Sequence, residues 1–113
     1  MRAFNLQGAA LDWAVTRANY EINHETVWEQ DRDTCKYSTD WAQGGPIIER
    51  EGITIAPHST HNGVIKEWKA GRDWPMSHSP YYFGPTPLIA AMRCYVASKM
   101  GEEINIPNEV SSI

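Results

Sequence analysis

The residues best suited to binding chemistry lie in a polar segment, residues 37–46, which reads YSTDWAQGGP. Its tryptophan, Trp41, offers a flat ring beside the hydroxyls of Ser38 and Thr39 and the amide of Gln43. Aromatic rings stack on nucleobases, and hydroxyl and amide groups orient the stacked ring. The segment therefore predicts a ligand-binding surface around Trp41. The alternative is a tryptophan that fills the protein core from a loop.

Glycine and proline precede a predicted helix at two places. Gly44-Gly45-Pro46 stands before a short helix, and Gly84-Pro85-Thr86-Pro87 stands before a long one. The first turn of a helix carries free N–H groups that suit an anion, and glycine lets a ligand approach the backbone. The same residues are also ordinary chemistry for starting a helix, so both interpretations stay open. The complete set of candidate ligand-binding residues is Tyr37, Ser38, Thr39, Trp41, Gln43, Gly44, Gly45, Thr86 and Arg93.

Arg93 joins this set because it lies five residues after Leu88, off the apolar face of the long helix. A guanidinium there can hold a phosphate or carboxylate with two parallel hydrogen bonds. It can equally pair with Glu49 or Glu51.

Catalytic and metal-binding patterns are weak. His58 and His61 are three residues apart in a predicted turn, with Glu67 as the nearby carboxylate, which is a poor zinc site. Nothing in the spacing of Asp12, Asp40 and Glu49 requires an acid–base pair, and we expect them to be solvated. No phosphate-loop or dinucleotide fingerprint occurs. We therefore expect no metal, no cofactor and no catalysis.

Composition limits the remaining classes. The chain has 113 residues and a net charge of −4, which predicts a single small domain over 1–113 and argues against direct binding to nucleic acid. No apolar run is long enough to cross a membrane, and the first ten residues do not resemble a signal peptide. A cytoplasmic location follows as an expectation, with Cys35 and Cys94 both reduced. We expect Cys94 to be buried and Cys35, which lies in a polar stretch, to be exposed.

Two helices are predicted by periodicity. The first covers residues 7–18, with Leu11, Ala14, Val15 and Ala18 on one face. Trp13 leaves that face, which indicates either a helix covered on two sides or an aromatic pocket wall. The second covers about 86–100, with Thr86 as N-cap and Pro87 as first residue, and its stripe is Leu88, Ala91, Met92, Tyr95 and Val96.

Shorter elements are expected between and after these helices. They are an edge strand at Tyr20 and Ile22, a helical turn over 46–51 ended by Gly52, strands over 53–56 and 64–70 around a loop at 58–63, an ordered loop over 72–85, and a short strand at Ile104 and Ile106. The last residues, 108–113, are expected to fray. The fold class is α+β, with both long helices packed on a short, mostly antiparallel sheet.

Three segments of the chain, residues 6–15, 37–51 and 84–99, resemble the phage NinX family. The resemblance implies a small accessory protein of tailed bacteriophages and their prophages. It implies no established activity and supplies no catalytic residues.

Our functional prediction is a non-catalytic protein that binds a small ligand, best a nucleotide-derived host defence signal that it sequesters. The alternative is an interaction factor that docks on a host or phage replication or recombination protein through an acidic face. A third class, a nucleotide hydrolase, lacks the acid–base or metal residues it needs. A pocket lined by Trp41 and Arg93 would favour the ligand, and a flat acidic surface with an apolar centre would favour the protein partner. A homo-oligomer is compatible with either.

Overall fold

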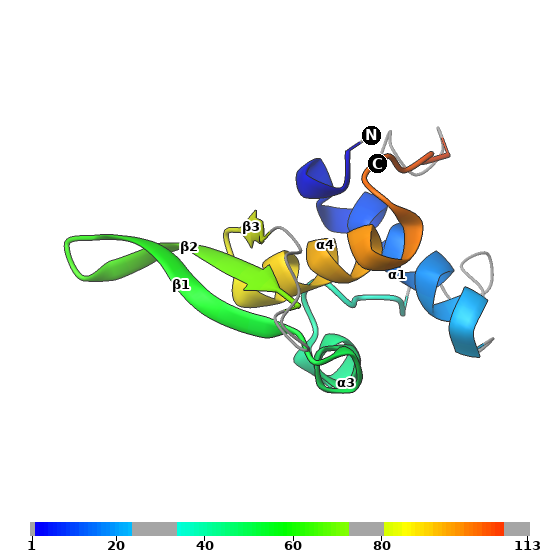
Figure 1. Ribbon diagram of the computed structural model, residues 1–113, viewed down its shortest axis with the longest axis horizontal. Coiled ribbons are helices and arrows are strands. Elements are labelled where there is room, and N and C mark those ends of the chain that lie inside the picture. The colour runs from blue at the N-terminus through cyan, green and yellow to red at the C-terminus, as the bar shows by residue number, and fades with distance from the viewer. Residues whose placement is uncertain (1, 24–33, 73–80, 108–113) are drawn as a thin grey trace.

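One helix, α4 (Pro87–Met100), lies at the centre of the fold, and the other elements pack around it (Figure 1). The computed structural model describes residues 2–23, 34–72 and 81–107. The elements around α4 are η1 (Ala3–Asn5), α1 (Gly8–Asn23), α3 (Trp41–Glu51), β1 (Thr54–His61), β2 (Val64–Gly71) and β3 (Tyr82–Gly84). The strands form one antiparallel sheet in the order β1-β2-β3, which confirms the predicted α+β class.

Helix α4 begins as the sequence predicts. The Thr86 hydroxyl accepts a 3.1 Å hydrogen bond from the Ile89 N–H, and Pro87 fills the first helical position, where no N–H is needed. All five residues of the predicted stripe are buried, and so are Ala90 and Cys94. The helix is thus covered on more than the predicted face, because the sheet, α1, α3 and η1 all contact it.

Helix α1 carries its predicted face inward but is longer than predicted. Leu11, Ala14, Val15 and Ala18 are all buried. The helix runs on to Asn23, so the prediction of an edge strand at 20–22 is wrong. Trp13 is half-buried and packs against the core, in agreement with a helix covered on two sides.

Helix α3 starts five residues earlier than predicted. Its N-cap is Asp40, whose carboxylate accepts a 3.0 Å hydrogen bond from the Ala42 N–H. Pro46 lies inside the helix, so the prediction that Gly44-Gly45-Pro46 forms a helix start is wrong. Gly52 ends the helix in the left-handed conformation at φ 65°, as predicted.

The hairpin of β1 and β2 is longer than predicted and extends beyond the helices (Figure 1). Strand β1 continues through Pro57 to His61, so the predicted stop at Pro57 and loop at 58–63 are wrong. Proline is tolerated because β1 is an edge strand, and the ladder is irregular just after it. Asn62 and Gly63, with φ of 52° and 78°, close the hairpin.

The remaining predictions are mixed. The expected loop over 72–85 contains β3, and residues 73–80 of it lie outside the described ranges. The strand expected at 104–106 is wrong, because the described tail forms only an isolated bridge between Arg2 and Glu103. Cys35 is buried, contrary to prediction, and Cys94 is buried as predicted. Neither cysteine is in a disulfide. The predicted fraying at 108–113 lies outside the described residues.

Among the helices of the described ranges, none has the length and apolar character needed to cross a membrane.

Candidate ligand-binding pocket

A pocket of about 200 Å³ opens where the N-terminal ends of α3 and α4 lie side by side. Its walls are Ser38, Thr39, Trp41, Thr86, Leu88 and Ile89. The first four are sequence-predicted ligand-binding residues, brought together from positions about 45 residues apart along the chain. Pockets that enclose drug-sized ligands measure roughly 300–1,000 Å³, so this one can hold one ring or one arm of a larger molecule.

Trp41 presents its side chain to solvent at the rim of this pocket. It is the first residue of α3, and 53% of its surface is exposed. A tryptophan that filled the core would be buried, so the structure contradicts the core alternative. The exposed ring stands next to an apolar floor made by Leu88 and Ile89.

Ser38 connects the pocket to α1. Its N–H donates a 2.8 Å hydrogen bond to the Asp12 carboxylate, and both residues are buried. Asp12 is therefore not solvated, contrary to prediction. Burial raises the pKa of Asp12, while the hydrogen bond from the Ser38 N–H, the nearby Ser38 hydroxyl and the charge of Lys36 oppose that rise. The Ser38 hydroxyl lies beside this carboxylate but makes no hydrogen bond of regular geometry within the described residues.

Gln43 and Tyr37, two further predicted site residues, contact other parts of the protein. The Gln43 amide donates to the Thr34 carbonyl at 2.7 Å and accepts from the Lys36 N–H at 2.8 Å. This side chain is thereby engaged in holding the segment that leads into α3. Tyr37 is buried in the core. Neither residue lines the pocket, so their predicted contact with a ligand gains no support from the geometry.

Gly44 and Gly45 face different surroundings. A Cβ atom on Gly44 would stand 2.6 Å from Leu88 Cδ1 and 2.6 Å from the Tyr37 carbonyl oxygen. On Gly45 the nearest atom would be Trp41 Cε3, at 3.9 Å. Gly44 is thus required for close packing of α3 on α4, which accounts for this glycine without any ligand.

Arg93 lies outside the pocket. Its Nε donates to the Leu6 carbonyl and its Nη1 to the Phe83 carbonyl, both at 2.6 Å. Burial lowers the pKa of Arg93, and the charge of Glu67 opposes this. The predicted pairing with Glu49 or Glu51 is wrong, because the guanidinium instead ties α4 to β3 and to the segment before α1.

The pocket therefore combines an exposed ring, an apolar floor and two exposed hydroxyl residues, Thr39 and Thr86, while the third hydroxyl, that of Ser38, is buried. Asp40 and Thr86 each cap the first turn of a helix there, and none of the lining residues carries a positive charge. Hydroxyls and a ring suit an uncharged heterocycle better than a phosphate group. Anion binding by the two helix starts, left open by the sequence, gains no support from this arrangement.

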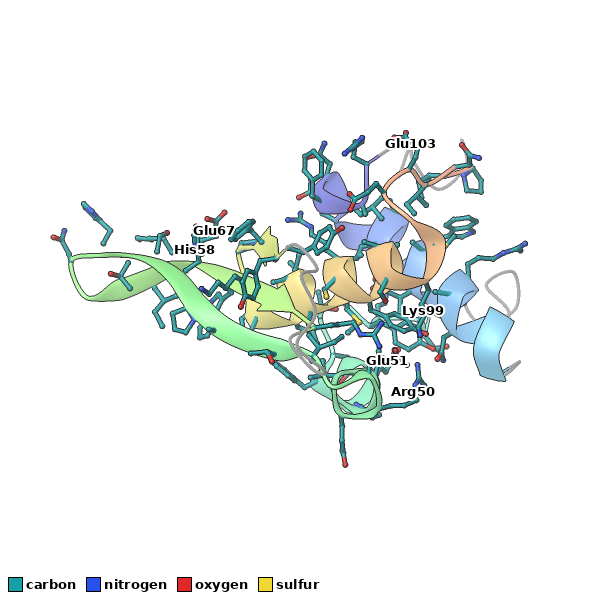
Figure 2. The ribbon with its side chains drawn as sticks, in the orientation of Figure 1. Arg50, Glu51, His58, Glu67, Lys99 and Glu103 are labelled. Atoms are coloured by element: carbon teal, nitrogen blue, oxygen red, sulfur yellow. The ribbon has the colours of Figure 1, made fainter. Side chains whose placement is uncertain are left out.

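His58, one of the two histidines considered for a zinc site, contacts Glu67 and Phe83. His58 Nε2 lies 3.8 Å from a Glu67 carboxylate oxygen, and its ring packs on Phe83 with centroids 4.4 Å apart (Figure 2 labels His58 and Glu67). Within the described ranges, no three His, Cys, Asp or Glu side chains come close enough to hold a metal ion.

The sequence analysis missed a second hollow, of about 320 Å³, which is lined by residues of η1, of β3 and of the segment after α4. We call it the aromatic groove, and its lining residues are Phe4, Tyr81, Tyr82, Phe83 and Glu102. The Tyr82 hydroxyl donates to the Glu102 carboxylate, and burial together with this carboxylate raises the pKa of Tyr82. The run of three aromatic residues at 81–83 was the available signal.

These features define a small α+β domain with a shallow pocket between two helix starts. The chain belongs to the family described as Bacteriophage P22, NinX, which matches residues 3–99. The match includes the whole pocket and confirms the family resemblance seen in the sequence. A search of curated proteins gives no match.

Proposed function

We propose that this phage NinX protein is a non-catalytic ligand-binding protein that acts in the host cytoplasm. Its pocket takes one ring of a small molecule, best a nucleotide-derived host defence signal that the protein sequesters. The observation that carries this proposal is the exposed Trp41 ring beside the exposed hydroxyl residues Thr39 and Thr86. A stacked base and oriented hydroxyls are the usual means of holding a nucleobase.

The dimensions of the pocket set the mode of binding. Because it measures about 200 Å³, it encloses a ring and leaves the rest of a nucleotide in solvent. Discrimination then depends on the base and not on the phosphates, since none of the described residues that line the pocket is a cation. Mono-, di- and cyclic nucleotides with the same base should bind with similar affinity.

A thermal-shift panel of mono-, di- and cyclic nucleotides tests the proposal. A ligand present at 100 times its Kd should add about 2.7 kcal/mol to the free energy of unfolding. Tyr81→Ala serves as the control variant, because it removes an exposed aromatic side chain at the aromatic groove, outside the pocket. The same nucleotide should raise its melting temperature as much as that of the unmodified protein. A panel in which no compound raises the melting temperature would remove the nucleotide from the proposal.

A second candidate function is docking on a host or phage replication or recombination protein. Two observations favour it: Phe4 and Tyr81 are exposed at the aromatic groove, and Val64 and Ile65 are exposed at the tip of the hairpin. Exposed apolar side chains of this kind mark contact surfaces. Phe4→Ala and Val64→Ala should then weaken the interaction with a purified partner, while Trp41→Ala should not.

A further inference from the structure

Three cationic side chains surround one carboxylate where the C-terminal ends of α3 and α4 meet the end of β2. The carboxylate oxygens of Glu51 lie 2.9 Å from Lys99 Nζ, 3.1 Å from Arg50 Nε and 3.8 Å from Arg72 Nη2. Figure 2 shows Arg50, Glu51 and Lys99 gathered at this end of the helices. We call Arg50, Arg72 and Lys99 the basic cluster.

Among the residues that the structure describes, one carboxylate, that of Glu51, is in ion-pair contact with the basic cluster. Three cations and Glu51 sum to +2, in a chain whose net charge is −4. The C-terminal ends of α3 and α4 each contribute about half a negative charge, which offsets roughly one unit. The described groups at this place therefore sum to about one positive charge.

The hydrogen bonds of the two guanidiniums differ. Arg50 also donates to Asn19 Oδ1 and to the Tyr95 hydroxyl, each at 3.1 Å, so it is well satisfied. Arg72 Nε is buried and has no hydrogen-bond partner among the described residues. Its Nη2 contact with Glu51, at 3.8 Å, is too long for a hydrogen bond. Because Nε is enclosed, a solute can meet only the remaining part of the Arg72 side chain, about a third of which is exposed.

We infer that the basic cluster is an oxyanion site that binds a phosphoryl group. Arg72 would donate from its two terminal nitrogens, which offer phosphate a fork of parallel N–H groups, and Arg50 and Lys99 would neutralise the remaining charge. Solvent reaches the site, since about a third of each cationic side chain is exposed. The site lies at the C-terminal end of α3, whereas Trp41 is its first residue, so it is separate from the pocket.

The test is a titration of ¹⁵N-labelled protein with inorganic phosphate at constant ionic strength, read on the arginine Nε–H resonances. The Arg72 signal should shift and saturate, and it is assigned by its loss in Arg72→Lys. That variant keeps the charge but loses the fork, so phosphate should bind about tenfold more weakly. Lys99→Gln should weaken binding as well, and it keeps the test open if Arg72→Lys does not fold.

The matched control is Arg2→Gln, which removes the same charge on the opposite side of the molecule, beside Glu103 (Figure 2). Its phosphate affinity should equal that of the unmodified protein. A second titration with a nucleoside triphosphate distinguishes the sources: tighter binding than phosphate identifies a nucleotide, and equal binding identifies a free phosphate. No saturable shift, or an equal loss in Arg2→Gln, would overturn the site. The same phosphate titration of Trp41→Ala should match that of the unmodified protein, because Trp41 belongs to the pocket and not to the basic cluster. Failure of the basic cluster and failure of the pocket are therefore distinguishable.

Discussion

The backbone N–H of Ser38 donates a 2.8 Å hydrogen bond to the carboxylate of Asp12, across 26 positions of sequence. Asp12 belongs to α1, and Ser38 lines the pocket just before α3. The bond therefore fixes the pocket wall to the first helix. It gives a buried carboxylate a structural role in the connection between α1 and the pocket.

Removing the Asp12 carboxylate should leave the Ser38 N–H buried without an acceptor. We expect Asp12→Ala to lower the free energy of unfolding by about 1–3 kcal/mol. Asp12→Asn keeps an acceptor oxygen at the same place and should cost clearly less. Urea denaturation compares the two variants, and equal stability of Ala and Asn variants would show that the bond contributes nothing.

The stability should depend on pH in opposite ways at two carboxylates. Burial raises the pKa of Asp12, so the folded state holds this proton more firmly, and stability falls as pH rises from its ordinary value of 3.8 through the folded-state pKa. Burial alone would raise the pKa of Glu51 too, but hydrogen bonds from Lys99 and Arg50 lower it overall. Its contribution is present above its ordinary value of 4.5 and is lost as pH falls through the folded-state pKa.

Denaturation curves of Asp12→Asn and Glu51→Gln across acid pH measure both effects. Relative to the unmodified protein, Asp12→Asn should become more stable as pH rises through this window. Glu51→Gln should become less stable over the same change. Parallel curves for all three proteins would contradict the pKa directions.

Two neighbouring glycines of α3 should respond oppositely to the same substitution. Gly44→Ala places a methyl group 2.6 Å from Leu88 Cδ1 and from a backbone oxygen, and overpacking of this kind costs about 1–3 kcal/mol. Gly45→Ala meets only an ordinary contact and should stabilise the helix by about 0.5–1 kcal/mol. Thermal melts compare the pair, and two variants of equal stability would refute the close packing of α3 on α4.

The thiols should be protected in the folded protein. Cys35 and Cys94 are both buried, and neither is in a disulfide. A thiol reagent without added reductant should label neither side chain quickly under native conditions and two per chain in denaturant. A count of zero in denaturant from a monomer would indicate a disulfide between them.

Local signals in the sequence predicted α4 and the inward face of α1 correctly. Thr86 and Pro87 fix the start of α4 through their own chemistry, and an apolar residue every three to four positions needs no knowledge of distant contacts. The start of α3 was missed because Pro46 resembles a first helical residue. Asp40 followed by Gln43 was the better signal, since an acidic cap with Gln three residues on is typical of a helix start.

Other features depend on tertiary context. Pro57 is tolerated in β1 because that strand is at the edge of the sheet, a position the sequence does not reveal. The turn at Asn62-Gly63 carried a recognisable hairpin signal. Of the candidate site, Ser38, Thr39, Trp41 and Thr86 meet at one pocket, while Gln43 and Arg93 are engaged by backbone groups of distant segments. Such long-range hydrogen bonds leave no periodic trace in a sequence.

The central claim, that the exposed Trp41 ring binds a ligand, is tested most directly by a melt and a titration of Trp41→Ala. Because the side chain is 53% exposed, the free energy of unfolding should change by less than about 0.5 kcal/mol. With the nucleotide identified by the thermal-shift panel, binding should weaken by about 1–3 kcal/mol, the usual loss of one base–aromatic stack. Tyr81→Ala should leave that affinity unchanged. Unchanged affinity in Trp41→Ala, or a loss of stability as large as that of a buried tryptophan, would contradict the account.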